Sequence, residues 1–289
     1  TKGKIKSRDG LVSGIGIQVA DNQKVGFASC AGFAEDSIKS TLEQAFKIAK
    51  NRPADPRFTG FVEVNQPGKD GELDKGILDH TGEDILSQIS DAVKLTEKYD
   101  ERLIGMTIAS NNIWGGHAIA NTNGVLEASL NTLNYCYANP VVLDKGERST
   151  AFDVKIGRSV QDIAGVVGSS VDMAMKHLGS VELGESINVP TIWHPLTAGD
   201  FLGTVFQAGL NGATVVEKRN PLGEKLNEEI AVKELNLVDD GQDPTKISTT
   251  SIDYEGTGRR RTKVIENGVL KSFLFNNYYG KIFGIGSTG

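Results

Sequence analysis

The sequence predicts an α+β fold, with antiparallel sheets and a few long amphipathic helices. Short alternations of apolar and polar residues are separated by the turn pairs Asn123-Gly124, Lys145-Gly146 and Asn267-Gly268, which is typical of antiparallel hairpins. Longer segments repeat apolar residues at helical spacing. Strands and helices do not alternate at the spacing of βαβ units, so we do not expect a doubly wound parallel sheet.

Residues 1–64 are predicted to form a hairpin followed by a helix. Residues 10–29 alternate around a turn at Asp21-Asn22. A helix is expected over residues 35–51, and two prolines within the next five residues end it. Its buried stripe is predicted to contain Ile38, Leu42, Ala45, Phe46 and Ala49.

Residues 77–185 are predicted to add two helices and a run of hairpins. One helix begins at Thr81, where Thr81 and Asp84 have the spacing of a capping box. The segments MTIAS, HAIANTNGV, SLNTLNYCYA and STAFDVKIG are expected to be strands. Another helix is predicted from Ser159 to Leu178, with Ser159 and Asp162 as its capping box. We therefore expect an N-terminal α+β domain over residues 1–185.

Residues 186–289 are predicted to begin a β-rich C-terminal domain that continues beyond residue 289. A strand over residues 188–193 precedes a helix that we expect to be capped by Thr197, with His194 and Pro195 outside it. Four further strands are expected at 232–239, 247–252, 262–266 and 269–276.

Composition disfavours several classes of protein. The net charge is −6, which argues against direct nucleic-acid binding, and we interpret Arg259-Arg260-Arg261 as a solvated face. Cys30 and Cys136 are too few and too far apart for a disulfide framework or a cysteine-built zinc site. Neither a signal peptide nor an apolar run of membrane-spanning length is present, so we expect a cytoplasmic protein.

The candidate catalytic residues are His194, Asp253 and Glu255. His194 could act as a base, although a histidine beside a helix start is more often structural. The two acids would share one face if a strand continues through Tyr254, but such residues commonly cap turns. The other three histidines have no metal-ligand spacing, and GIGSTG at 284–289 is a weak match to a dinucleotide motif. No cofactor is therefore expected from these residues alone.

Three segments resemble the PmbA/TldD family, which is also called modulator of DNA gyrase. They are KVGFASCAGFAEDSIKSTLEQAFKIAKNRPADPRF, IANTNGV and SIDYEGTGRRRTKVIENGVLKSFLFNNYYGKIFGIGSTG. The resemblance implies a cytoplasmic two-subunit shell around a cavity, with a zinc protease motif, His-Glu-x-x-x-His, in TldD-type members. The corresponding residues 203–208 read GTVFQA, with Gly203, Thr204 and Ala208 at the ligand and base positions. The chain is therefore similar to the PmbA (TldE) branch, which lacks the metal.

This resemblance leads to one hypothesis and two alternatives. The chain is expected to be the non-metal subunit of a peptide-processing protease system that encloses unfolded peptide. Its partner would be a second copy of itself or a TldD-like paralogue that holds the zinc. Alternatively, it is a regulatory protein-binding module without a protease role. A third reading is a metal-free hydrolase that uses His194 with Asp253 or Glu255.

Overall fold

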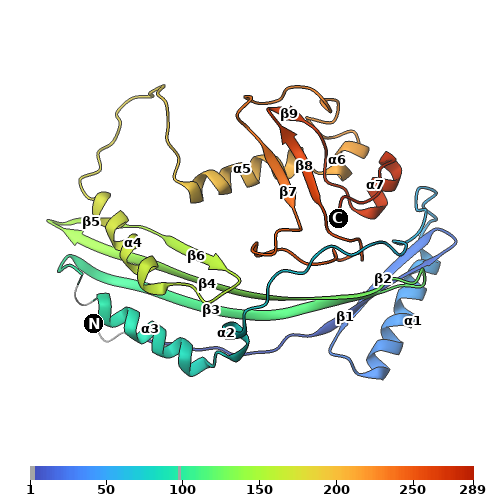
Figure 1. The fold of residues 1–289 in the computed structure, drawn as a ribbon, viewed down its shortest axis with the longest axis horizontal. Helices are drawn as coiled ribbons and strands as arrows, with labels where there is room; N and C mark the ends of the chain where they lie inside the picture. The colour runs from blue at the N-terminus through green and yellow to red at the C-terminus, as the bar shows by residue number, and fades with distance from the viewer. Residues whose placement is uncertain (1–3, 97–98) are drawn as a thin grey trace.

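A computed structural model describes residues 4–96 and 99–289, and it has the predicted α+β architecture (Figure 1). The helices are α1 (Glu35–Asn51), α2 (Lys75–Asp79), α3 (Gly82–Thr96), α4 (Ile163–Lys176), α5 (Pro195–Gly209), α6 (Gly212–Val216) and α7 (Asn277–Phe283). The strands are β1 (Gly14–Asp21), β2 (Lys24–Ala31), β3 (Leu103–Ala120), β4 (Leu126–Asp144), β5 (Glu147–Thr150), β6 (Asp153–Gly157), β7 (Leu237–Asp240), β8 (Arg261–Glu266) and β9 (Val269–Leu270). They form three antiparallel sheets: β1–β2, β3–β4–β5 with β6 also on β4, and β7–β8–β9.

The N-terminal hairpin turns one residue later than the sequence predicts. Asp21 still pairs with Lys24, so the turn residues are Asn22 and Gln23, with φ values of 50° and 63°. Two successive positive φ values are those of a type I′ turn, whose twist matches that of paired strands. The hairpin then packs on α1 so closely that a Cβ at Gly26 would lie 2.1 Å from the Ala45 carbonyl oxygen.

The α1 helix has the predicted bounds but a narrower buried stripe than expected. Its buried residues are Thr41, Ala45 and Ala49, all of them small. Leu42 and Phe46, which we predicted to be buried, are exposed. A two-stranded hairpin covers only a narrow strip of a helix, which explains why the large side chains beside that strip stay uncovered.

The first three strand segments predicted after residue 104 merge into one long hairpin, β3–β4, whereas the predicted turn at Lys145-Gly146 is confirmed and joins β4 to β5. Strands β3 and β4 pair from Ala120 with Leu126 near the turn to Leu103 with Val142 at the far end, with one irregularity between Leu103 and Gly105. The polar segment around Asn111 and Asn112 does not interrupt the strand. Its polar side chains are hydrogen-bonded across the hairpin, since the Asn134 amide donates to the Asn112 side-chain oxygen at 2.6 Å.

Helices α3 and α4 cover one face of this hairpin. The core between them contains Ala92, Cys136, Ala138, Ile163, Val166 and Val167. The predicted capping box of α3 is confirmed, because the Thr81 N–H donates to Asp84 at 2.8 Å and the Asp84 N–H donates to Thr81 at 3.3 Å.

The α4 helix begins later than predicted, and Ser159 is not its cap. Asp162 is the N-cap, and its carboxylate accepts from the Gly165 N–H at 2.9 Å. The preceding residues remain extended, because the Gln161 N–H donates to the Asn134 side chain of β4 at 3.0 Å. Gly168 of α4 allows a close contact, since a Cβ there would lie 2.6 Å from the Tyr99 hydroxyl.

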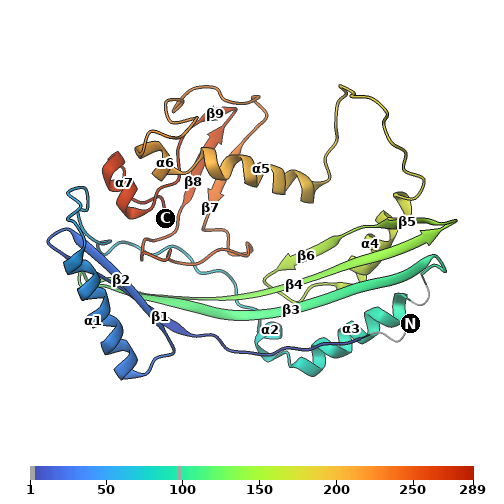
Figure 2. The same cartoon turned by 180° about the vertical axis from the view of Figure 1, so that it is seen from behind.

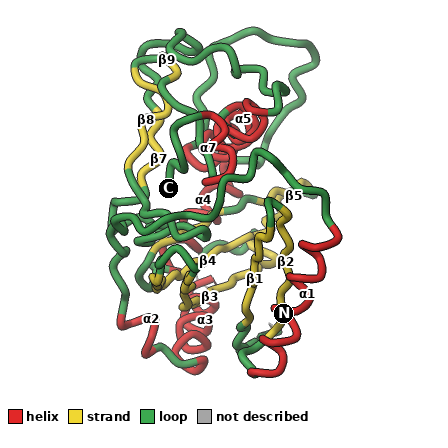
Figure 3. Tube along the Cα trace, turned by 90° about the vertical axis from the view of Figure 1, so that its right-hand side faces the viewer, coloured by secondary structure: helices red, strands yellow, loops and turns green. Residues whose placement is uncertain are grey.

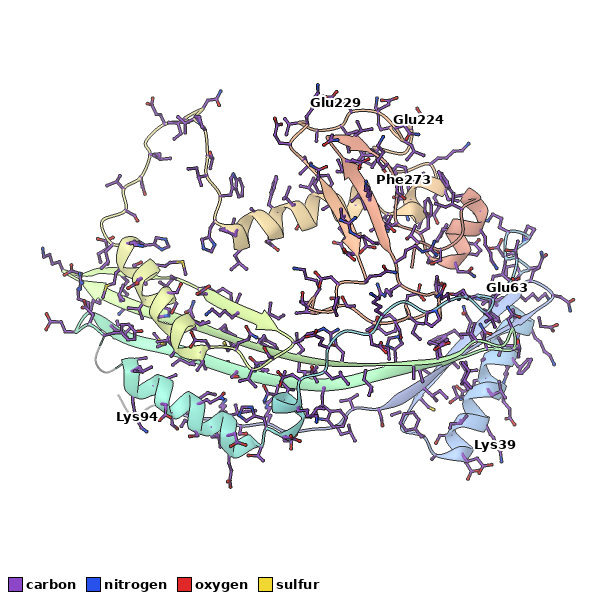
Figure 4. All side chains as sticks on the ribbon, viewed as in Figure 1. Lys39, Glu63, Lys94, Glu224, Glu229 and Phe273 are labelled. Atoms are coloured by element: carbon purple, nitrogen blue, oxygen red, sulfur yellow. The ribbon has the colours of Figure 1, made fainter. Side chains whose placement is uncertain are left out.

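The C-terminal unit has its own core around the β7–β8–β9 sheet. Its buried side chains are Leu210, Val264, Ile265, Leu270, Phe273 and Phe275. Figure 4 shows Phe273 within this unit, with Glu224 and Glu229 at its periphery. The predicted Asn267-Gly268 turn joins β8 to β9, and Gly268 has a φ of 77°.

Several strands predicted in the C-terminal unit are shorter or absent. Residues 188–193 form no strand, because this exposed segment has no neighbour to pair with. Residues 247–252 are turns with one bridge from Ile252 to Gly258, and the strand predicted at 232–239 is reduced to β7. The strand predicted at 269–276 stops at Leu270, and α7 follows at Asn277, where we expected a strand-like run.

A loop-rich layer connects the C-terminal unit to the long hairpin (Figure 3). The Asp70 carboxylate accepts from the Ser129 hydroxyl at 2.5 Å and from the Ser251 N–H at 2.9 Å. The buried Arg158 donates to the carbonyl oxygens of Lys246 at 2.7 Å and Glu72 at 3.0 Å, and also to that of Thr249. Within the part of the chain that the structure describes, no helix has the length and hydropathy needed to cross a membrane.

Candidate functional site

The α5 helix begins three residues earlier than predicted, which changes the role of His194. His194 is the N-cap, and its Nδ1 accepts from the Leu196 N–H at 3.4 Å. Pro195 is the first helical residue, where its fixed φ suits the helix and its missing N–H has no partner to lose. Thr197, the expected cap, lies inside the helix.

Apolar side chains of α5 are largely uncovered. Leu196, Phe201 and Val205 are 44%, 51% and 50% exposed. In Figures 1 and 2 the helix projects from the C-terminal unit above β6, and it packs substantially against no other described helix or strand. Only its last turn joins the C-terminal core, through Phe206 and the following Leu210.

The exposed apolar surface continues upstream of α5. Residues 181–194 are exposed throughout, and Ile192 is 99% accessible. Trp193 stacks on Phe201 with ring centroids 5.1 Å apart, which joins this segment to the helix. We call residues 187–205 the α5 surface. Contiguous apolar surface of this kind marks an interaction site in a folded protein.

Residues 203–208 of α5 do not fit a zinc ion. Residues 203–208 contain no imidazole, thiolate or carboxylate, and zinc is held in proteins by those groups. In residues 4–96 and 99–289, no three His, Cys, Asp or Glu side chains come together as metal ligands would.

The two candidate acids lie close together, but both carboxylates already accept hydrogen bonds from backbone N–H groups. Residues 253–257 form a tight loop instead of the strand that would have placed the acids on one face, and Gly256 has a φ of 91°. Asp253 accepts from the N–H groups of Glu255 at 2.9 Å and Thr257 at 2.8 Å. Glu255 accepts from the Asn277 N–H at 2.7 Å, at the start of α7. Burial raises the pKa of Glu255, and the charge of Asp253 acts in the same direction.

His194 is not joined to these acids. Among the described residues, no hydrogen bond or ion pair links His194 to Asp253 or Glu255, and the start of α5 points away from the loop that carries them (Figure 2). The GIGSTG segment is a helix end and a turn, since Gly284 caps α7 with a φ of 96°. The structure therefore brings together only the two acids of the three candidates.

A small cavity of 240 Å³ lies on the hairpin face opposite α3 and α4. Its lining includes His117 and Asn131 on neighbouring strands, and the ring of Tyr254 from the C-terminal unit is tilted against the His117 ring with centroids 4.7 Å apart. His117 Nε2 and Asn131 Oδ1 are buried there without a hydrogen-bond partner. Sequence reasoning missed this group, because its members are far apart along the chain. Only the register of the long hairpin brings them together.

Comparisons with known proteins agree with this architecture along the chain. Residues 186–289 match the model described as PmbA/TldA metallopeptidase C-terminal domain, and residues 2–49 match PmbA/TldA metallopeptidase domain 1. The chain belongs to the PmbA/TldD family.

Curated relatives within the PmbA/TldD family are similar over nearly the whole chain. An uncharacterized protein of Methanocaldococcus jannaschii is 25% identical over 281 residues, covering 97% of this chain and 64% of its own. Metalloprotease PmbA of Escherichia coli O157:H7 is 23% identical over 283 residues, covering 95% of this chain and 62% of its own. The chain thus spans slightly less than two thirds of the length of these relatives.

Solved structures share the PmbA/TldD fold. TldE from Thermococcus kodakarensis superposes with a TM-score of 0.78 at 22% identity, over 94% of this chain and 62% of that one. A putative modulator of DNA gyrase from Thermotoga maritima superposes with a TM-score of 0.81 at 20% identity, over 96% of this chain and 63% of that one.

Proposed function

We propose that this chain is a non-metal subunit of a peptide-processing metalloprotease system of the PmbA/TldD type. It pairs with a second copy or with a TldD-like paralogue to form a shell that encloses unfolded peptide in the cytoplasm. Residues 1–185 and 186–289 would be its two domains. The observation that carries this proposal is the α5 surface, which is apolar, uncovered and without zinc ligands at 203–208.

The α5 surface supports the shell because its exposure is costly unless another surface covers it. Burying apolar area contributes roughly 25 cal/mol per Å² removed from water. Phe201, Val205 and the neighbouring Trp193 offer large side chains of the kind that dominate protein interfaces.

Open strand edges support peptide binding. Among the described residues, β3 and β6 each pair only with β4, so the outer edge of each is available for an added strand. An extended peptide bound at such an edge is held by main-chain hydrogen bonds, which tolerate many sequences. This mode suits a subunit that must accept unfolded peptide of varied composition.

The lack of metal ligands on α5 supports a division of labour between two subunits. Zinc hydrolases need protein ligands and a group that activates water, and residues 203–208 provide neither. The proposed TldD-like partner would supply the zinc.

The first test is elemental analysis of the purified protein together with its mass in solution. We expect far less than one zinc per chain and a mass that shows a dimer. Trp193 can report on the same event, since Trp114→Phe leaves it as the only tryptophan and subunit association should shift its emission to shorter wavelength. One zinc per chain would contradict the non-metal assignment.

Co-purification separates the shell from the regulatory alternative. With the protein expressed at its natural level, we expect a TldD-like chain to be recovered with it if the partner is a paralogue. Recovery of a topoisomerase subunit instead, from a zinc-free protein that stays monomeric, would favour a regulatory binding module and contradict the protease assignment.

A further inference from the structure

Of the three consecutive arginines at 259–261, Arg260 and Arg261 are exposed, as a solvated face requires, and Arg259 is half-buried. Arg261 pairs with Asp240 of β7 at 2.9 Å. Arg259 and Arg260 instead line a cavity of 470 Å³ together with Lys69. The remaining lining consists of Asn65, Gln66, Pro67, Gly68, Gln242 and Gly258.

The three cations of this cavity have no ion-pair partner among residues 4–96 and 99–289. No described carboxylate lies within 4.0 Å of Lys69, Arg259 or Arg260. The Arg259 Nε is moreover buried without a hydrogen-bond acceptor, which is unusual for a guanidinium group. Asp239 attracts Arg259 from a greater distance, but burial raises the pKa of Asp239. The cavity therefore has a local excess of positive charge.

Hydrogen bonds fix the walls of the cavity in place. On one side, the Gly68 N–H donates to the Ser251 carbonyl oxygen at 2.7 Å, and the Asn65 side-chain oxygen accepts from the Gly258 N–H at 2.6 Å. On the other side, the Gln242 amide donates to the Arg259 carbonyl oxygen at 3.3 Å. A site held this way is already organised before a ligand arrives, so little ordering opposes binding.

We propose that this cavity binds the carboxylate group of a peptide, with Arg259 and Arg260 as donors and Lys69 as an additional positive charge. This inference rests on the proposed function, since that function supplies peptide as the ligand. Arginine forms paired hydrogen bonds with carboxylates, and both Arg259 and Arg260 line the cavity. The volume lies within the range of small-ligand pockets and leaves room for residues beside the carboxylate. Gln66 and Gln242 suit the amide groups of those residues.

Titration calorimetry with three short peptides tests the ligand. The probes are acetyl-Gly-Ala-Ala as the free acid, the same peptide as its C-terminal amide, and acetyl-Gly-Ala-Glu amide. We expect at least one acid-bearing peptide to bind tenfold or more tightly than the neutral amide. The first peptide would identify a chain terminus as the source of the carboxylate, and the third would identify an acidic side chain. Equal binding of all three would overturn the proposal, as would binding of inorganic phosphate without either acid.

Matched arginine variants test the site. Arg259→Met should weaken binding of the preferred peptide tenfold or more, whereas Arg261→Met should change it less than twofold, because Arg261 is paired with Asp240 outside the cavity. Equal losses would show diffuse charge attraction and would overturn the site. If Arg259→Met fails to fold, Lys69→Met on the exposed loop provides the second variant, with a loss of threefold or more expected. These titrations do not depend on zinc content or on the mass in solution. The carboxylate-binding proposal can therefore be contradicted without contradicting the proposed subunit shell.

Discussion

Helices α4 and α5 are similar in length and apolar content, but they have opposite surroundings. The α4 helix buries Ile163, Val166, Val167, Ser170, Val171 and Ala174 against α3 and the long hairpin. The α5 helix buries only Gly209 within its length and leaves Phe201 and Val205 in solvent. An apolar stripe in a sequence indicates that a helix needs a covering surface, but it does not say whether that surface belongs to the same chain.

The contrast between α4 and α5 separates the apolar residues that stabilise the single chain from those that are available for binding another surface. The apolar residues of α4 contribute to folding of the single chain, because their partners are within it. Those of α5 can contribute only when another surface arrives, so their contribution depends on protein concentration. Substitutions in the two helices should therefore differ in kind as well as in size.

The largest expected difference is between Val167→Asp in α4 and Phe201→Asp in α5. Val167 is fully buried, so an unpaired carboxylate there should lower the free energy of unfolding by about 4 kcal/mol or more. At low concentration, Phe201→Asp should change it by no more than about 0.5 kcal/mol, since the side chain is half exposed. Urea unfolding over a concentration series measures both. If Phe201→Asp were strongly destabilising at every concentration, α5 would have to be covered within its own chain.

A second prediction concerns Arg158, which lies just before α4 and donates hydrogen bonds to the loops that lead to the C-terminal unit. Arg158→Met should lower the free energy of unfolding by about 3 kcal/mol, because it leaves carbonyl oxygens of Glu72, Lys246 and Thr249 without a donor. Thermal unfolding followed by circular dichroism measures this loss. Arg102→Met, at a partly exposed ion pair with Asp100, is the control variant and should cost less, because solvent still reaches the pair. Similar losses in both variants would show that the buried hydrogen bonds of Arg158 contribute no more to the free energy of unfolding than a partly exposed ion pair does.

The smallest expected effects come from the helix caps. Asp162→Ala should destabilise the protein by about 1 kcal/mol, and His194→Ala by less, since α5 is barely packed. Hydrogen bonding to the Gly165 N–H lowers the pKa of Asp162 below its usual 3.8. The cap contribution is therefore complete above pH 3.8 and is lost as the pH falls through the lower value of the folded state. Unfolding measured at pH 7 and pH 2.5 checks this, and an Asp162→Ala effect that is the same at both values would contradict it.

Local features of the fold were predictable from the sequence. The α1 bounds, the Thr81 capping box and the Asn123-Gly124 turn all came from residues close together in the chain. Each depends on backbone preferences or on hydrogen bonds that span a few residues. Such features are determined before any tertiary contact forms.

Features that depend on distant partners were mispredicted or missed. Residues 188–193 have strand composition but no neighbouring strand, so β propensity alone gave the wrong answer. Asp162 capped α4 in place of Ser159 because of a contact with β4, which the local sequence does not reveal. Of the candidate site, sequence reasoning correctly identified α5 as a helix. Sequence reasoning could not predict that Lys69 and Arg259 line the same cavity, because the two residues are far apart in the chain and no local pattern links them.

The loop that carries Asn65 and Asp70 has a consequence for how the chain is made. Its hydrogen-bond partners, Gly258 and Ser251, are 193 and 181 residues further along. At ordinary rates of synthesis, those partners emerge from the ribosome roughly 10 to 40 s after the loop does. The long hairpin can pair during this interval, and the loop can already contact it through Asp70 and Ser129. The bonds that join the loop to the C-terminal unit, in contrast, can form only after residues 251–258 have emerged.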